Sequence, residues 1–326
     1  VSLWANPSEL PEDQQSLIEL STGLGVSVEE FTLKMRRAES RNFVYLRRRA
    51  KPSDADAILS LGLPGVYGEK EYHRFYPGGE IAAHVVGFTN IDDVGQEGIE
   101  LSFDDWLRGK PGKKKVLKNL YGEIVRDIMP VAEAVPGRNL RLSIDQRLQF
   151  LAYRELKSAI SQYQALSGSF VLLDVQTGEV LAMANQPSYN PNNRIQLDLS
   201  SVRNRAVTDV FAPGSTVKPF TVAVALESGL DMGHTIDTSP GFLKVDDAVI
   251  KDPRNRGVLD LGGILAYSSQ VGISRLALSL NEYDIWKQFQ TLGFGEVTGV
   301  GFPGESSGFL PNRRRWKDIE RVTFAY

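Results

Sequence analysis

Apolar side chains recur three and four positions apart between Gln146 and Tyr163, which is the spacing of one face of a helix. Ser143 or Asp145 can cap the first turn, because a side-chain oxygen there accepts a hydrogen bond from an unpaired backbone N–H. The spacing therefore predicts a helix within LRLSIDQRLQFLAYRELKSAISQY, residues 140–163. Its apolar face consists of Leu148, Leu151, Ala152, Ala159, Ile160 and Tyr163.

Two short apolar runs follow, 170–173 and 180–183, and a turn around Gln176, Thr177 and Gly178 separates them. Two β-type runs joined in this way predict a hairpin. Both runs are nearly continuous rather than alternating, so we expect both faces of their sheet to be covered. The predicted fold class is α+β, with helices on both faces of an antiparallel sheet.

The segment DVFAPGSTVKPFTVAVALESGL, residues 209–230, places Lys218 in an otherwise apolar run. Residues 216–228 can form a helix that ends at Gly229, with Ser215 at or near its N-terminus. Pro219 falls in the first turn, where backbone N–H groups lack partners within the helix. A helix that is apolar almost all round belongs inside a domain, where an unpaired lysine is costly. That cost suggests a chemical role for Lys218.

Ser215 and Lys218 are three positions apart, so they lie on one helical face and the amine can reach the hydroxyl. A desolvated lysine loses affinity for its proton and can take one from a serine, which makes the serine a nucleophile. The alternative is that Ser215 only caps the helix and Lys218 extends to solvent. A lone Ser-x-x-Lys pattern favours that alternative, because it is common by chance.

A second polar segment changes this balance. In LAYSSQVGISRLAL, residues 265–278, Ser268 and Gln270 precede an apolar helical run. A hydroxyl and a carboxamide on a turn can relay a proton and bind a peptide group, although they can also be a simple polar cap. The order of hairpin, Ser-x-x-Lys helix and Ser-x-Gln turn favours catalysis.

Composition removes several other classes of function. The chain has 326 residues, a net charge of -3 and a pI near 5.8, which gives no case for nucleic-acid binding. Short basic clusters at 41–51, 113–115 and 313–315 are interpreted as solvated faces. There is no cysteine, so disulfides and a cysteine nucleophile are excluded. The three histidines are His73, His84 and His234, and their spacing is not that of a metal site. We therefore expect no metal or cofactor.

Residues 1–138 differ in character from the rest. They contain short mixed elements and frequent turn signals such as PG, PGG and GKPGK, which predict an extended α+β module. PGRN at 136–139 is the expected junction. The predicted domains are therefore 1–138 and 139–326. No apolar run approaches the ~18 to 20 residues of a membrane span, and the sequence begins without Met, so any anchor is expected outside it.

The long stretches RNRAVTDVFAPGSTVKPF, YSSQVGISRLAL and GFPGESSGFLPNRRRW, in this order, resemble class B penicillin-binding proteins. RFYPGGEIAAHVVGFTNIDDVGQEGIELSFDDWL resembles the N-terminal pedestal of the division-specific, septal members from Gram-negative bacteria. The resemblance implies a non-catalytic, dimerisation-like pedestal followed by a transpeptidase domain related to serine β-lactamases. It also implies a membrane-anchored protein whose body lies in the periplasm, with divisome proteins, including a glycan-polymerising one, as partners.

The implied activity is acyl transfer on peptidoglycan stem peptides, with inhibition by β-lactams. On this resemblance Ser215 is the nucleophile, Lys218 its base, Ser268 the proton relay to the leaving amine, and Gln270 the holder of the substrate amide. The family usually has Asn where Gln270 stands, and Glu is frequent among division-type members where Ala212 stands. The third family motif, Lys-Thr/Ser-Gly, is absent before residue 326, so the transpeptidase domain is expected to be incomplete.

Two alternatives stay open beside a septal transpeptidase. One is a catalytically impaired divisome scaffold, which Gln270, Ala212 and the missing third motif favour. The other is an elongation-type transpeptidase. A β-lactamase fits less well, because it would lack the pedestal half, and a Ser-His-Asp triad would need His234 close to Ser215.

Overall fold

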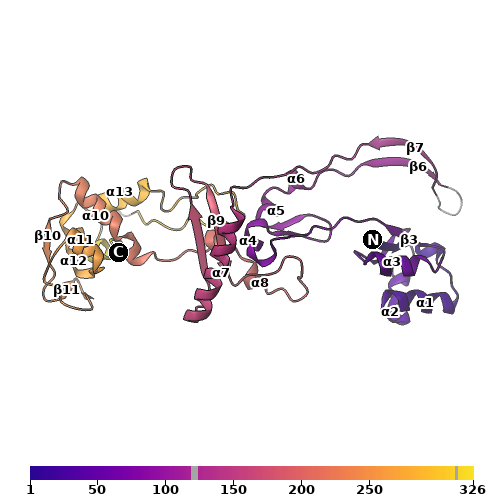
Figure 1. Cartoon of the computed structure of the whole chain (residues 1–326), viewed down its shortest axis with the longest axis horizontal. Coiled ribbons are helices and arrows are strands. Elements are labelled where there is room, and N and C mark those ends of the chain that lie inside the picture. Colours follow the sequence, from indigo (N-terminus) through magenta and orange to yellow (C-terminus); the bar gives the residue numbers. More distant parts are fainter. Residues whose placement is uncertain (119–123, 313–314) are drawn as a thin grey trace. The chain divides into compact units, whose positions relative to one another are not determined.

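The structure is a computed structural model, and it describes residues 1–118, 124–312 and 315–326 (Figure 1). The chain divides into two compact units, Val1–Pro77 and Gly78–Tyr326. Two arginines of the predicted basic cluster at 313–315 lie outside the described residues.

The first unit packs helices against a three-stranded antiparallel sheet. Its strand order is β2-β1-β3, so β1 is the central strand and pairs with a neighbour on each side. Leu3 of β1 is fully buried and packs with Leu20, Phe31 and Ile58 from the helices. The elements are β1 (Ser2–Ala5), a 3-10 turn (Pro7–Glu9), α1 (Gln14–Leu24), α2 (Val28–Arg36), β2 (Val44–Arg47), α3 (Pro52–Leu59) and β3 (Val66–Glu69).

The second unit begins with short elements that are tied to the later part of the chain. The imidazole of His84 is hydrogen-bonded to the Ser201 carbonyl at 2.8 Å, and the Tyr189 hydroxyl donates to the Ala83 carbonyl at 3.0 Å. These elements are a 3-10 turn (Gly79–Ile81), α4 (Ala83–Val86), β4 (Phe88–Thr89), β5 (Gly95–Glu97), α5 (Gly98–Ser102), α6 (Asp104–Leu107) and the paired strands β6 (Lys113–Lys118) and β7 (Ile124–Ala132).

The predicted long helix and hairpin are confirmed. Helix α7 (Gln146–Tyr163) is capped by Asp145, whose carboxylate accepts from the first backbone N–H groups. It lies against the antiparallel hairpin of β8 (Gly168–Leu173) and β9 (Val180–Gln186) (Figure 1). The turn between the strands is held by Asp174, which accepts from the N–H groups of Gln176 and Thr177.

A buried glutamine joins α7 to β9. The Gln149 carboxamide is 2% exposed; it donates to the carbonyls of Met183 and Ile81 and accepts from the Met183 N–H, each at 2.8 Å. Both backbone groups of Met183 therefore have a side-chain partner on the edge of β9 that faces away from β8. Gln149 therefore supplies the hydrogen bonds that a further strand would otherwise make to Met183 at this edge of β9.

The prediction that both faces of this sheet are covered fits the buried β9 and is wrong for β8. Most of β9 is buried, whereas Phe170, Val171 and Leu173 of β8 are 40%, 43% and 51% exposed. Both strands of this two-stranded sheet are edges, but the core beside α7 includes the buried Ala182 and Ala184 of β9, whereas Leu172 of β8 is only partly buried against it. The apolar run gave the strand correctly but not its surroundings.

The remaining elements form a helical layer with small β-pairs around a second core. Its fully buried residues include Ala225, Leu261, Ile264, Ile273 and Leu276. The elements are α8 (Leu199–Val202), α9 (Arg205–Thr208), a 3-10 turn (Gly214–Val217), α10 (Lys218–Glu227), β10 (Thr235–Asp237), β11 (Phe242–Val245), β12 (Ala248–Lys251), β13 (Val258–Asp260), α11 (Leu261–Ala266), α12 (Gln270–Ser279), α13 (Asp284–Thr291) and α14 (Asp318–Phe324). The pairs are β10 with β13 and β11 with β12.

Candidate acyl-transfer site

Ser215 lies in a 3-10 turn rather than in the first turn of an α-helix. The expected helix from residue 216 begins as α-helix only at Lys218, because Pro219 has no N–H to donate to the Ser215 carbonyl. The Lys218 N–H donates to that carbonyl instead, which closes a tighter turn. Gly214 enters this turn with φ of 61°, a left-handed conformation that a side chain disfavours. The Ser215 side chain is exposed at the head of α10.

Lys218 is buried, as its apolar surroundings predict. The residue is 1% exposed, and it follows Val217 and precedes Val222 and Ala225 of the same core. Its Nζ donates to the Ser268 carbonyl at 2.7 Å and to the Ser268 Oγ at 3.1 Å. Burial lowers the pKa of the Lys218 amine, and the negative charge of Asp252 opposes that shift. The amine therefore gives up its proton more readily than an exposed lysine does.

The turn between α11 and α12 presents Ser268 and Gln270. Ser268 has φ of 51°, the left-handed conformation, and its side chain is exposed. Ser269 is buried and caps α12 by accepting from the Gly272 N–H at 2.8 Å. The Gln270 side chain is half-buried, and within the described ranges its carboxamide makes no hydrogen bond. The amide group is thus available to a ligand.

The structure brings Lys218 and Ser268 into contact from positions 50 residues apart. It places Ser215 one 3-10 turn before Lys218, where residues three apart eclipse each other on one face. Between the side chains of Ser215 and Lys218 the described part of the chain shows no hydrogen bond. Ser215 and Lys218 are therefore one turn apart, and the Lys218 amine is held by Ser268.

Sequence reasoning missed Asp252, which directly follows β12. Its carboxylate accepts from the Ser269 hydroxyl at 2.5 Å, the Gln270 N–H at 2.6 Å and the Val271 N–H at 3.1 Å. The only local signal was an Asp-Pro pair at the end of a strand, which normally indicates a turn.

A small apolar cavity of about 200 Å³ adjoins the segment that leads to Ser215. Ala212, Gly214 and Val217 line one side, and aromatic rings that include Phe289 and Phe324 line the other. Ala212 lines this cavity and is itself exposed.

Two family comparisons cover most of the chain. Residues 168–326 match the penicillin binding protein transpeptidase domain, and residues 1–142 match the penicillin-binding protein dimerisation domain. The chain belongs to the class B penicillin-binding proteins. The resemblance in the sequence motifs and the α+β fold class are thereby confirmed.

Individual relatives agree with this membership. The chain is 42% identical to peptidoglycan D,D-transpeptidase FtsI of Escherichia coli K12 over its whole length, and it spans 56% of that relative. Penicillin binding protein 3 of Mycobacterium tuberculosis is similar in structure, with a TM-score of 0.67 and 31% identity over 77% of this chain and 53% of that one. A peptidoglycan synthetase from Bifidobacterium adolescentis shares the fold, with a TM-score of 0.70, 24% identity, and coverage of 100% and 64%.

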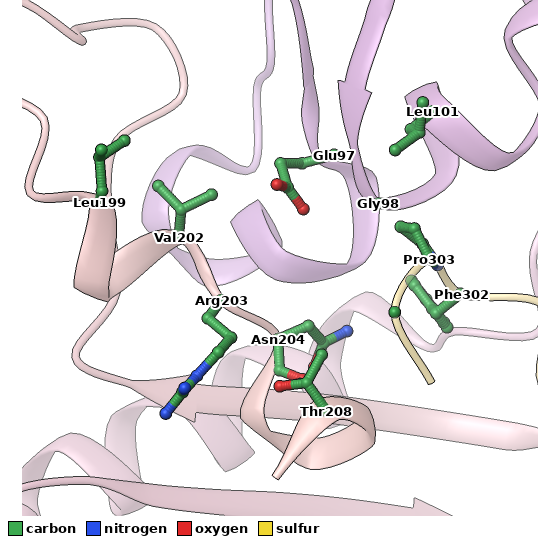
Figure 2. Close-up of a pocket in the computed structure, with 11 residues that line it drawn as sticks. Glu97, Gly98, Leu101, Leu199, Val202, Arg203, Asn204, Thr208, Phe302 and Pro303 are labelled. Atoms are coloured by element: carbon green, nitrogen blue, oxygen red, sulfur yellow. The ribbon is translucent and has the colours of Figure 1, made fainter. Parts of the chain in front are cut away.

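A larger cavity of this class B penicillin-binding protein, about 390 Å³, lies away from Ser215 (Figure 2). Glu97 points into it, and burial raises the pKa of its carboxyl group. The Thr208 hydroxyl, which also lines it, donates to the Asn204 carbonyl or the Asp209 carboxylate. Neither Ser215 nor Lys218 lines this cavity, so acyl transfer is not assigned to it.

Within 1–118, 124–312 and 315–326, no three His, Cys, Asp or Glu residues gather in a way that could hold a metal ion. In these ranges, too, every helix is too short or too polar to cross a bilayer.

Proposed function

We propose that this chain carries the acyl-transfer machinery of a peptidoglycan D,D-transpeptidase that acts at the division septum. The observation that supports this most directly is the buried amine of Lys218, hydrogen-bonded to the Ser268 hydroxyl and one turn from the exposed Ser215. The same enzymatic name is carried by the Escherichia coli relative, of which the chain spans about half.

Proton counting favours a neutral Lys218 as the base. A neutral amine has two N–H donors and one lone pair, whereas the ammonium form has three donors. Ser268 supplies two acceptors, its carbonyl and its hydroxyl oxygen. A third N–H would be left without an acceptor in a buried place, apart from the Tyr326 ring 5.4 Å away. The neutral amine instead keeps its lone pair for the hydroxyl proton of Ser215.

The proposed reaction takes the steps that the family resemblance implies. Ser215 gives its proton to Lys218 and attacks the carbonyl between the two terminal D-alanines of a stem peptide. The proton passes through Ser268 to the leaving amine, and an acyl-enzyme remains on Ser215. An amine from a neighbouring stem attacks that ester and forms the cross-link. Gln270 holds the substrate amide, and β-lactams acylate Ser215 by the same path.

The rest of the protein is assigned by family membership. Residues 1–138 form the non-catalytic pedestal and 139–326 the transpeptidase part; this boundary remains a prediction. We also propose a periplasmic body on a single N-terminal anchor in the inner membrane, and divisome partners that include a glycan polymerase. Neither metal nor nucleic acid has a part in this function.

The test is covalent labelling by a fluorescent penicillin. The product of the complete reading frame is incubated with the probe and separated on a denaturing gel. We expect a labelled band from the parent and none from Ser215→Ala. Labelling that persists in Ser215→Ala would contradict the assignment of the nucleophile.

A second candidate is an impaired scaffold of the same family. Gln270 favours it, because its carboxamide is carried by one methylene more than that of the usual Asn, about 1.5 Å on ordinary bond geometry. The rate of labelling separates the two, since a scaffold leaves the parent unlabelled even though Ser215 and Lys218 are present. An elongation-type transpeptidase would be labelled too; its depletion would change cell width rather than block septation.

A further inference from the structure

Asp252 holds the turn that carries Ser268 and Gln270. One of its carboxylate oxygens accepts from the N–H groups of Gln270 and Val271, at 2.6 and 3.1 Å, and the other accepts from the Ser269 hydroxyl at 2.5 Å. Asp252 is itself fixed by its backbone N–H, which donates to the Gly241 carbonyl at 3.0 Å. The first backbone N–H groups of helix α12 therefore have an acceptor in Asp252, which directly follows strand β12.

The Ser268–Gln270 turn needs this support because its backbone conformation is unfavourable and because it holds the Lys218 amine. Ser268 adopts φ of 51°, a conformation that a non-glycine residue keeps only when its surroundings impose it. The same residue receives both hydrogen bonds of the Lys218 amine. Any movement of the 268–270 turn therefore moves the acceptors that orient Lys218 toward Ser215.

We propose that Asp252 is a positioning residue for acyl transfer, which fixes the Ser268–Gln270 turn against Lys218. It touches neither the substrate nor the reacting atoms in the mechanism above, and the proposal rests on the proposed function. Nothing in the local sequence pattern distinguishes it from an ordinary turn aspartate; the role comes from the three contacts across 17 to 19 residues of chain.

The charge of Asp252 provides a readout that a purely structural role would not move. Two titratable groups contact or influence the Lys218 amine: the Asp252 carboxylate, which raises its pKa, and the Tyr326 phenol, whose ring lies 5.4 Å away. Asp252→Asn keeps an oxygen for the Gln270 and Val271 N–H groups but removes the charge. The pKa of Lys218 should then fall further, so the rising limb of the acylation rate should shift to lower pH.

Asp252→Ala removes the acceptors as well. The turn then loses its support, and we expect the second-order rate of acylation to fall roughly 10- to 100-fold, the range that a displacement of about 1 Å can cause. Asp174→Ala is the matched control. Asp174 also accepts two backbone N–H groups through one oxygen, but it does so in the β8–β9 turn and has no contact with Ser268.

The experiment measures acylation by a fluorescent penicillin across about pH 6 to 10 for the parent, Asp252→Asn, Asp252→Ala and Asp174→Ala. We expect the parent profile for Asp174→Ala, an acid shift for Asp252→Asn and a reduced rate for Asp252→Ala. Equal rates in Asp252→Ala and Asp174→Ala, or an unshifted Asp252→Asn profile, would overturn the proposal. If Asp252→Ala fails to fold by circular dichroism, the Asp252→Asn profile decides alone.

A second measurement separates this proposal from the proposed function. The titration of Lys218 is followed by NMR of its ¹³Cε in the parent and in Asp252→Asn, with no substrate present. A lower titration midpoint in the variant supports the coupling even if the parent is not labelled, in which case only the transpeptidase assignment fails. An unchanged midpoint contradicts the role of Asp252 even if labelling succeeds.

Discussion

Replacing Lys218 tests whether the buried amine acts as a base. In Lys218→Met an apolar side chain of similar length fills the same space, and the loss of a general base should lower the acylation rate by about 10² to 10⁴, or roughly 3 to 5 kcal/mol of barrier. Two hydrogen bonds to Ser268 are lost, at about 0.5–1.5 kcal/mol each, but a buried polar group is removed too. The free energy of unfolding should therefore change by less than about 2 kcal/mol.

Lys218→Arg is the informative partner of this variant. A guanidinium can still donate to Ser268, yet it does not give up its proton at any pH at which proteins fold. We therefore expect Lys218→Arg to lose acylation as Lys218→Met does, although it keeps hydrogen-bond donors for Ser268. The assay is stopped-flow acylation with circular dichroism as the check on folding. A folded Arg variant within tenfold of the parent rate would refute the base assignment.

Three further outcomes are expected. Gln270→Asn should raise the acylation rate in the same assay, because the carboxamide returns to the shorter stem; an unchanged rate would contradict the importance of its reach. Gln149→Ala should lower the free energy of unfolding in urea by about 2–4 kcal/mol, since buried backbone groups of Met183 lose their partners, and a loss under 1 kcal/mol would argue against this. Burial lowers the pKa of His84, so the folded state favours the neutral imidazole. The stability that the neutral form contributes is present above about pH 6.5 and is lost as the pH falls toward the folded-state pKa. His84→Gln should therefore flatten this part of the plot of unfolding free energy against pH.

The sequence predicted those elements whose residues are close along the chain. Helix α7 followed from apolar spacing and a cap, the β8–β9 hairpin from two runs and a turn, and the end of α10 from Gly229. Burial of Lys218 also followed, because the residues on either side of it are apolar. These features depend on local geometry that a linear pattern records.

Features that depend on distant residues were not predictable in this way. Asp252, at the end of β12, accepts a hydrogen bond from Ser269 in the turn before α12. Gln149 is hydrogen-bonded to Met183, 34 residues further along the chain. The exposure of β8 depends on which strand of the hairpin the core beside α7 covers, and an apolar run does not reveal this. The 3-10 turn before α10 could have been predicted from the sequence, because Pro219 has no N–H for the α-helical hydrogen bond to the Ser215 carbonyl.

Peptide mapping of the penicillin adduct tests the central claim most directly. The labelled product of the complete reading frame is digested, and the modified residue is located by mass spectrometry. The mechanism predicts a single adduct, on the Ser215 hydroxyl, that disappears in Ser215→Ala and is strongly reduced in Lys218→Met. An adduct on Ser268 or on any other side chain, or an adduct on Ser215 that forms equally fast without Lys218, would contradict it.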